Sequence, residues 1–294
     1  MSNFKQSCLI LDKPSGMSSN QALAKIKKKI NQKKAGFSGT LDPLASGLLI
    51  IFFNKATKLF SLFLGADKSY EAIIKLGYVS ETGDSDGEII SEKDVPNLDE
   101  KDLRVLEEKY TGVIEQVPPM YSALKHKGKR LYEYARKGIN IKRDAREVNI
   151  YNIKLGIIDK DHISLKVKCS KGTYIRTLAE QIGEDIGCGA LLSKLVRTQI
   201  NNIDLSSAVN FEDFLASSDE DICEKHMKNV DSILDNFNAC YLSEINQIKI
   251  LNGNKVVIDE KPCKMLKIYD LKDNFLGVGE VNNNSELIPK KILV

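Results

Sequence analysis

The chain is organised around residues 36–53, GFSGTLDPLASGLLIIFF, where a glycine-rich bend leads through Asp42 and Pro43 into an apolar run. The run Leu48–Phe53 predicts a buried strand, because it is short and entirely apolar. Glycines allow a tight bend and a close approach of the backbone to a bulky ligand. Pro43 biases Asp42 toward extended geometry, which gives its side chain a fixed direction. Taken alone, an Asp-Pro pair after glycines also fits an ordinary turn.

The composition is that of a globular protein with about two domains, given a length of 294 residues. With 42% hydrophobic and 28% charged residues, a disordered chain is excluded. The uncharged stretch 43–54 is too short for a membrane-spanning helix, which needs about 20 residues. Lys5, Asp12 and Lys13 flank the short run 8–11, so we expect no secretory signal. The six scattered cysteines have no metal-binding or redox spacing, which predicts free thiols in a cytoplasmic protein.

Charge is unevenly distributed, although the net charge is only +3. Residues 13–41 hold seven lysines and no acid, whereas residues 212–224 hold six acids and no base. Residues 117–146 hold nine lysines and arginines against Glu133 and Asp144, a local charge of +7. Tyrosines lie among these cations, so this segment could pair with phosphates and stack on bases. We therefore expect a local footprint for a polyanion, the alternative being a solvated surface.

Hydrophobic periodicity predicts mixed strands and helices up to about residue 231 and a small β-rich region after it. Helices are predicted to begin at Ser18 or Ser19, at Asp99 and at Thr173. We expect an acidic loop at 217–221, and an irregular start to segment 117–146. The predicted strands are 7–11, 48–53, 70–77, 148–158 paired with 162–169 as a hairpin, 191–200, 264–269 and 275–281.

The bend resembles the catalytic motif of the TruB-type tRNA pseudouridine synthases, whose pattern is close to G-H-x-G-x-L-D-P-x-A-x-G-x-L. Four more segments match that family in the same order: LDKPSGMSSN (11–20), DKSYEAIIKLGYVSETGDSDGEI (67–89), QVPPMYSALKHKGKRLYEYARKG (116–138) and CSKGTYIRTLAEQIGEDIGCGALLSKLVRTQI (169–200). The tail FLGVGEVNNNSELIPKKILV (275–294) resembles the small PUA-like domain that ends bacterial members.

The resemblance implies an α+β architecture in two domains. Residues 1–231 would form a pseudouridine synthase domain, with a mixed, largely antiparallel sheet and flanking helices. Residues 117–146 would be its RNA-binding thumb insertion, and residues 232–294 a β-rich, PUA-like RNA-binding domain. The implied partner is the T-arm of tRNA. We expect a monomer with no obligate protein partner, no membrane attachment, no metal and no cofactor.

The resemblance also implies the chemistry: isomerisation of uridine to pseudouridine at position 55 in the T-loop, on a base flipped out of its stack. Asp42 would be the essential aspartate, either as nucleophile or as the base that opens a glycal route. Arg176 would hold the Asp42 carboxylate charged through two parallel hydrogen bonds. Tyr70 would stack on the target base and help to remove its C5 proton.

The resemblance implies further contacts of this site with RNA. Tyr174 and Leu195 would line the uridine pocket, and Phe37 stands where the family usually has a histidine close to the flipped nucleotide. Phenylalanine keeps the ring but loses both nitrogens, so stacking support could survive while any hydrogen bond to phosphate is lost. The expected phosphate contacts are Lys13, Lys68, Lys125, Lys129 and Arg130.

Three other classes of protein are alternatives at this stage. A non-catalytic RNA-binding or RNA-folding protein would not need a carboxylate facing a polyanion. A guide-RNA-dependent relative of the archaeal and eukaryotic type would lack a full thumb. A nucleotide hydrolase is disfavoured, because no Gly-Lys-Ser/Thr sequence opens a helix after the glycines.

Overall fold

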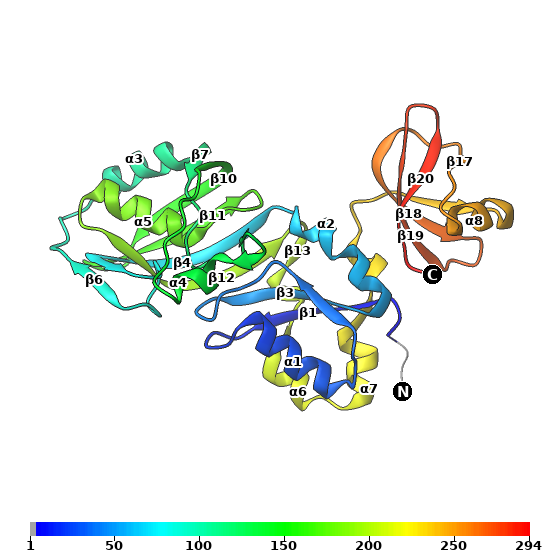
Figure 1. Ribbon diagram of the computed structural model, residues 1–294, viewed down its shortest axis with the longest axis horizontal. Coiled ribbons are helices and arrows are strands. Elements are labelled where there is room, and N and C mark those ends of the chain that lie inside the picture. Colours follow the sequence, from blue (N-terminus) through cyan, green and yellow to red (C-terminus); the bar gives the residue numbers. More distant parts are fainter. Residues whose placement is uncertain (1–3) are drawn as a thin grey trace.

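The computed structural model describes residues 4–294 and contains a large and a small β-sheet (Figure 1). Within these residues the large sheet has eleven strands and the small one five. No helix in the described part of the chain is long and apolar enough to cross a membrane.

The large sheet is built by residues 7–229. Its strands are β1 (Ser7–Lys13), β2 (Ala35–Ser38), β3 (Ser46–Phe53), β4 (Lys68–Leu76), β7 (Gly112–Gln116), β10 (Arg146–Ile157), β11 (His162–Cys169), β12 (Ala190–Ile200), β13 (Ile203–Asp204), β14 (Val209–Asn210) and β15 (Met227–Asn229). The strand order is β14-β1-β3-β12-β4-β11-β10-β7, while β2 pairs with β3, β13 with β12 and β15 with β1.

The large sheet consists of two antiparallel halves that meet at strands β3 and β12. These two strands are parallel and share only the pairs Ser46–Val196 and Gly47–Arg197. The β1–β14 pair is also parallel, and all remaining strand pairs of the large sheet are antiparallel. The prediction of a mixed, largely antiparallel sheet is confirmed. The narrow β3–β12 junction lies directly after the Asp42 bend.

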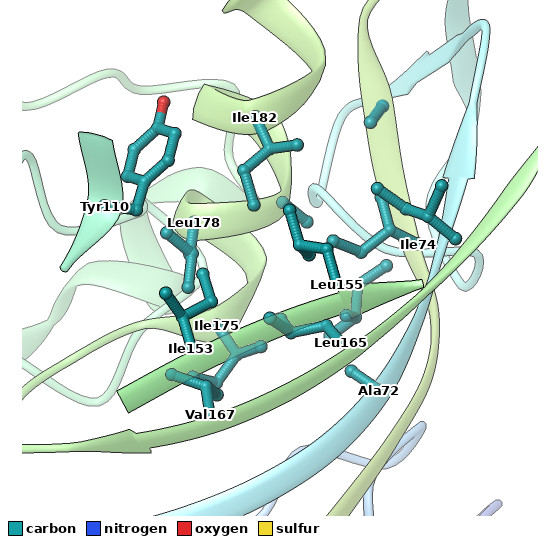
Figure 2. Close-up of a cluster of buried hydrophobic side chains, with 14 of the residues drawn as sticks. Ala72, Ile74, Tyr110, Ile153, Leu155, Leu165, Val167, Ile175, Leu178 and Ile182 are labelled. Carbon is teal, nitrogen blue, oxygen red and sulfur yellow. The ribbon is translucent and has the colours of Figure 1, made fainter. Parts of the chain in front are cut away.

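Helix α5 (Ile175–Ile186) covers the half of the sheet that contains β4, β10 and β11. Its residues Ile175, Leu178 and Ile182 recur at helical spacing and point onto Leu165 and Val167 of β11 (Figure 2). Gly187 ends the helix in the left-handed region, with φ of 92°. Helix α3 (Glu100–Tyr110) packs beside it, capped by Asp99 as predicted.

Helix α1 (Ser19–Lys29) lies on the other half of the sheet, near α6 (Phe211–Ala216) (Figure 1). Ser18, one of the two predicted caps, caps α1 in a capping box with Gln21. Its buried face packs in a cluster with β1 and β3, and its lysines lie on the opposite face.

The small sheet is formed by β16 (Ala239–Leu242), β17 (Val256–Val257), β18 (Cys263–Asp270), β19 (Phe275–Val281) and β20 (Glu286–Ile292), in the order β16-β18-β19-β20-β17. Helix α8 (Glu244–Leu251) belongs to this part of the chain. Phe275, Val278 and Leu293 join a hydrophobic cluster with residues of β1 and β3. The two sheets therefore share a core.

The remaining elements connect these layers. They are the ribbons β5 (Tyr78–Ser80) with β6 (Ile89–Glu92) and β8 (Lys125–His126) with β9 (Lys129–Arg130), helices α2 (Phe60–Leu64), α4 (Leu131–Ala135) and α7 (Asp219–Asp221), 3₁₀ turns at Asn54–Leu59, Leu205–Ser207 and Val230–Ile233, and a π-type turn at Ile222–His226. The strand prediction for the 148–158 and 162–169 hairpin is confirmed by the β10–β11 pairing.

The prediction of an acidic loop at 217–221 is wrong in part, because α7 begins at Asp219. Ser218 caps this short helix by accepting a hydrogen bond from the Asp221 amide. Acidic side chains in a first helical turn are stabilised by the helix dipole. Ile222, which follows directly, is buried in the cluster beneath α1 and α6. The Ser218 cap and the burial of Ile222 thus give residues 219–221 a helical structure, where their composition alone predicts a solvated loop.

Candidate active site

The bend that carries Asp42 is fixed by the first residue of α1 and by the turn before that helix. Ser19 Oγ donates to the carbonyl oxygen of Leu41 at 2.9 Å and accepts from the Leu41 amide at 2.8 Å. The Gly16 amide donates to the Pro43 carbonyl at 2.8 Å. Ser15 Oγ donates to the Leu44 carbonyl at 2.7 Å. With its backbone held on both sides, Asp42 has little freedom to leave its position.

Asp42 forms an ion pair with Arg176, as the sequence predicted. Arg176 Nη2 lies 3.0 Å from Asp42 Oδ2. The Arg176 side chain is only 6% exposed, whereas that of Asp42 is 44% exposed and accessible to a ligand. Arg176 is therefore no surface cation, although it lies in the first turn of α5.

The predicted pair of parallel hydrogen bonds between Arg176 and Asp42 is wrong. Nη2 also donates to the Tyr121 carbonyl at 2.6 Å, and Nη1 donates to the Thr82 carbonyl at 2.7 Å. Nη1 lies 3.6 Å from Asp84 Oδ2. The guanidinium of Arg176 therefore contacts four groups: two carboxylates and two backbone carbonyls. The segments at 82–84 and 121 approach it in the folded chain, which the sequence does not show.

Asp84 is a second buried carboxylate that sequence reasoning missed. Its side chain is 6% exposed, and it accepts hydrogen bonds from Thr82 Oγ1 at 2.5 Å and from the Asp86 amide at 3.2 Å. The arginine thus lies between two acids. In the sequence, Asp84 stands in the polar stretch ETGDSDG, where an acid is ordinary. No signal separated it from its neighbours.

The surroundings raise the pKa of the Asp42 carboxyl above its usual value. Burial by the walls of the site is the main cause, since it disfavours the charged form even though the side chain is partly accessible. The Arg176 charge opposes this and lowers the pKa, whereas the Asp84 charge raises it further. The site can therefore present a carboxylate of increased basicity and limited hydration.

Tyr70 lies on β4 beside the same site. It stands opposite Arg197 of β12 in the strand pairing. Burial raises the pKa of the Tyr70 hydroxyl, and Arg197 acts in the opposite direction. Tyr70 packs against the hydrophobic cluster that contains Leu41 and Ala45, which flank Asp42 in the bend. The structure thus brings Asp42, Tyr70 and Arg176 together.

Lys13 and Lys68 are buried, so their positions do not fit the predicted phosphate contacts. Lys13 is fully buried and donates to the carbonyls of Pro14 and Met17 at 2.7 and 2.6 Å. Lys68 is 8% exposed and donates to the Ala66 carbonyl at 2.5 Å. Burial, together with the charge of Arg197, lowers the pKa of each lysine to about 8. Both ammonium groups therefore support the backbone.

The two predicted pocket residues, Leu195 and Tyr174, and the predicted nucleotide contact Phe37 lie on three different elements or their ends. Leu195 lies on β12 and is 9% exposed, in the core beneath α5. Tyr174 precedes α5 and is half-buried, with the Arg146 guanidinium 5.2 Å from its ring centroid. Phe37 lies on β2 and packs against the cluster shared by β1, β3 and α1. Its ring supports the core, and no described contact joins it to Asp42.

The thumb segment presents its cations on a small hairpin. Lys125, Lys129 and Arg130 are exposed on the β8–β9 ribbon. Its turn consists of Lys127 and Gly128, with φ of 48° and 83°, as a type I′ turn requires. The segment from Val117 to β8 has no regular structure, as predicted. Because Tyr121 bonds to Arg176, this segment is connected directly to the Asp42 site.

Among the described residues, one group of side chains could hold a metal ion: Asp159, Asp161 and His162. It lies at the turn between β10 and β11, and exposed acidic groups of this kind are common without a metal. The Asp42 site itself offers two carboxylates separated by a guanidinium, which is a poor arrangement for a cation.

The fold is that of the pseudouridine synthases, followed by a PUA-like domain. A chain in the "Structure of H/ACA RNP bound to a substrate RNA containing 2'-deoxyuridine" has a TM-score of 0.74 at 22% identity, covering 99% of this chain and 86% of that one. A chain in the "Crystal Structure of a Cbf5-Nop10-Gar1 Complex" gives the same values. At this identity the similarity establishes the fold alone.

The chain belongs to the TruB family of pseudouridylate synthases, which confirms the predicted family. The profile described as "TruB family pseudouridylate synthase (N terminal domain)" matches residues 27–175. The profiles "tRNA pseudouridylate synthase B C-terminal domain" and "Pseudouridine synthase II TruB, C-terminal" match residues 176–235 and 239–293.

Several relatives carry the name tRNA pseudouridine synthase B, and two of them illustrate the identity and coverage. The protein from Azoarcus sp. (strain BH72) is 44% identical over 285 residues, 97% of this chain and 94% of its own length. The protein from Burkholderia lata is 42% identical over 292 residues, 97% of this chain and 89% of its own length.

Proposed function

We propose that this protein converts uridine to pseudouridine at position 55 in the T-loop of tRNA, without a cofactor. The observation that carries the proposal is the ion pair between Asp42 and the buried Arg176. The family profiles cover both residues, Asp42 in the N-terminal profile and Arg176 in the profile that follows it. Relatives that are 44% and 42% identical, in alignments that cover 97% of this chain, are named tRNA pseudouridine synthase B.

In the proposed reaction, the N-glycosidic bond of the uridine breaks, the uracil turns, and a bond forms between C5 and C1′ while the C5 proton is lost and N1 gains one. Atoms and electrons balance within the nucleotide and water. Asp42 acts either as a nucleophile or as the base that opens a glycal route, and its geometry is compatible with both. The neighbouring Arg176 favours the charged carboxylate that either route requires.

Tyr70 is proposed to stack on the flipped uracil and to help remove its C5 proton. Its ring packs at the edge of the core beneath α5, against the cluster that contains Leu41 of the Asp42 bend. Stacking between aromatic and apolar side chains is a common way to receive a base taken out of a helix. We assign Leu195 and Tyr174 to the walls of the same pocket.

Flipping the target base costs a few kcal/mol, which the enzyme must offset with RNA contacts. The exposed cations Lys125, Lys129 and Arg130 of the thumb hairpin are proposed to bind phosphates of the T-arm. The small sheet, taken as a domain over residues 232–294, is proposed to bind RNA as well. We propose that the protein acts in the cytoplasm as a monomer.

The test is an assay with the purified protein and a tRNA transcript carrying 5-tritiated uridine. Tritium should be released to the solvent, and pseudouridine should form at position 55 but not in a transcript with cytidine there. Asp42→Asn should abolish both signals. Absence of product from the parent protein, or equal product from Asp42→Asn, would refute the proposal.

The same assay separates the alternative functions. A non-catalytic RNA binder would retain the transcript without releasing tritium. A guide-dependent enzyme would be inactive on bare tRNA until guide RNA and partner proteins were added. The ordered, basic β8–β9 hairpin disfavours the guide-dependent class, whose members lack a full thumb.

A further inference from the structure

Arg197 of β12 is a buried cation that the proposed reaction does not yet use. It is 1% exposed and ranks first by volume among the fully buried side chains of the described residues. No ion pair of Arg197 occurs within residues 4–294. Burying a charge without an opposite charge is expensive unless hydrogen bonds compensate it. The contacts of its guanidinium therefore indicate what it does.

Two of these contacts bracket the bend that carries Asp42. Arg197 Nε donates to the Leu48 carbonyl at 2.8 Å, and Nη2 donates to the Gly39 carbonyl at 2.9 Å. A Cβ at position 39 would lie 3.2 Å from Arg197 Nη1. Glycine thus lets the guanidinium approach the backbone closely. Because the two carbonyls fix two nitrogens of a planar group, the direction of its remaining N–H bonds is fixed too.

The third contact of Arg197 is the hydroxyl of Tyr70. The two residues are opposite each other in the β4–β12 pairing, where side chains lie on the same face of the sheet. Their side chains interact, and the Arg197 charge lowers the pKa of the Tyr70 hydroxyl against the effect of burial. A guanidinium has donors only, so the Tyr70 oxygen must be the acceptor. The Tyr70 O–H proton is then available for a different partner.

A purely structural role does not explain this arrangement well. Lys13 and Lys68 are also buried nearby, and the charge of Arg197 disfavours both ammonium groups. An apolar residue on β12 would avoid the repulsion among three cations. Buried ion clusters of this kind are weak stabilisers of a fold. The arrangement is instead suited to controlling the orientation and charge of one hydroxyl in the site.

We propose that Arg197 is a positioning residue that fixes the Tyr70 hydroxyl as a hydrogen-bond acceptor and so orients the phenol toward the bound uracil. The proposal rests on the proposed function, because it assigns Arg197 to the same reaction. The carbonyls of Gly39 and Leu48 hold the guanidinium, and the guanidinium holds the phenol. Arg197 thereby couples the position of Tyr70 to that of the Asp42 bend.

The test is a double-mutant cycle of Arg197→Lys and Tyr70→Phe, measured as single-turnover rates at saturating tRNA. Lysine keeps the charge but loses the planar fork. We expect Arg197→Lys to lower the rate by about 10²-fold, with the Kd for tRNA changed by less than about twofold. In the Tyr70→Phe background the same substitution should change the residual rate by less than about threefold. Equal losses in both backgrounds would overturn the proposal.

A second measurement does not depend on activity. With ¹³C at Cζ of tyrosine, the Tyr70 resonance is identified by its absence in Tyr70→Phe. It should shift in Arg197→Lys but not in Ile200→Ala, which removes buried volume from the same strand. An unshifted resonance in Arg197→Lys would refute the hydrogen bond. If Asp42→Asn is inactive while Tyr70→Phe retains the full rate, the proposed function stands and the role of Arg197 falls.

Discussion

At the scale of single residues, the site depends on one arginine between two acids. Arg176 contacts Asp42, approaches Asp84, and donates to two backbone carbonyls. It therefore keeps the carboxylate of Asp42 charged and also connects it to the thumb segment through Tyr121. A lysine at this position would supply the charge without the planar set of donors.

The raised pKa of Asp42 predicts a specific pH dependence. Because the reaction requires the ionised carboxylate, the rate should fall as pH decreases through this pKa, starting above the range of an ordinary aspartate, 3.8. Arg176→Gln removes the main group that lowers the pKa, so the acid limb should move to higher pH and the rate should fall by about 10²-fold. Single-turnover rates measured across pH provide the test.

The matched control for this prediction is Arg104→Gln, since Arg104 is exposed and pairs with Glu100 on α3. Its acid limb should coincide with that of the parent protein. An acid limb that stays in place in Arg176→Gln would show that Asp42 does not titrate in this range.

At the scale of elements, the junction of β3 and β12 depends on a glycine. Gly47 has a φ of 100°, and a Cβ there would lie 2.4 Å from the carbonyl oxygen of Arg197. Gly47→Ala should cost about 3 kcal/mol or more, from left-handed strain together with overpacking. The free energy of unfolding in urea measures the effect.

Gly16→Ala is the comparison that separates the two causes. Gly16 has a φ of 85°, but nothing lies within 4 Å of a Cβ at that position. Its cost should be about 1 kcal/mol, from backbone strain alone. Equal costs for the two substitutions would mean that the close approach of β12 has no energetic consequence.

The thumb hairpin should determine the salt dependence of RNA binding. Replacing Lys125, Lys127, Lys129 and Arg130 together with glutamine should flatten the plot of log Kd against log salt concentration. Each lost phosphate contact should reduce the slope by about 0.7–0.9. Filter binding or fluorescence titration at several salt concentrations gives the slope.

The control removes the same charge from another element. Lys28, Lys29, Lys33 and Lys34 lie on or just after α1, on the other half of the large sheet. Their replacement with glutamine should leave the slope close to that of the parent. An unchanged slope in the thumb variant would show that the hairpin does not contact RNA phosphates.

At the scale of the whole molecule, the two sheets share a hydrophobic cluster. Phe275, Val278 and Leu293 pack with residues of β1 and β3, and Lys58 donates to the Ile292 carbonyl at 2.6 Å. The small sheet is therefore anchored to the large one, although it has its own core. We expect the orientation of the two sheets to be part of the native structure.

This shared core predicts one cooperative thermal transition. Leu293 is fully buried, so Leu293→Ala should cost about 2–4 kcal/mol and lower the temperature of the transition. Leu271→Ala should have little effect, because Leu271 is 67% exposed. Scanning calorimetry measures both. Two well-separated transitions in the parent protein would contradict the shared core.

Local patterns in the sequence were sufficient for much of the fold. The caps at Ser18 and Asp99, the β10–β11 hairpin and the apolar face of α5 all depend on neighbouring residues, and all were predicted correctly. The family and the identity of Asp42, Tyr70 and Arg176 as candidates came from motifs in order. These features are local, so the chain itself determines them.

Only the tertiary structure determined which charged side chains contact each other in the site. Asp84 and Arg197 come from segments far apart in the chain. Asp84 matters for the site because it is buried beside Arg176, and Arg197 because it lies opposite Tyr70. Lys13 was predicted to contact phosphate, but the fold buries it completely. Burial changes the cost of a charge, and contact across strands selects its partner. Neither quantity is a property of a residue and its neighbours in sequence.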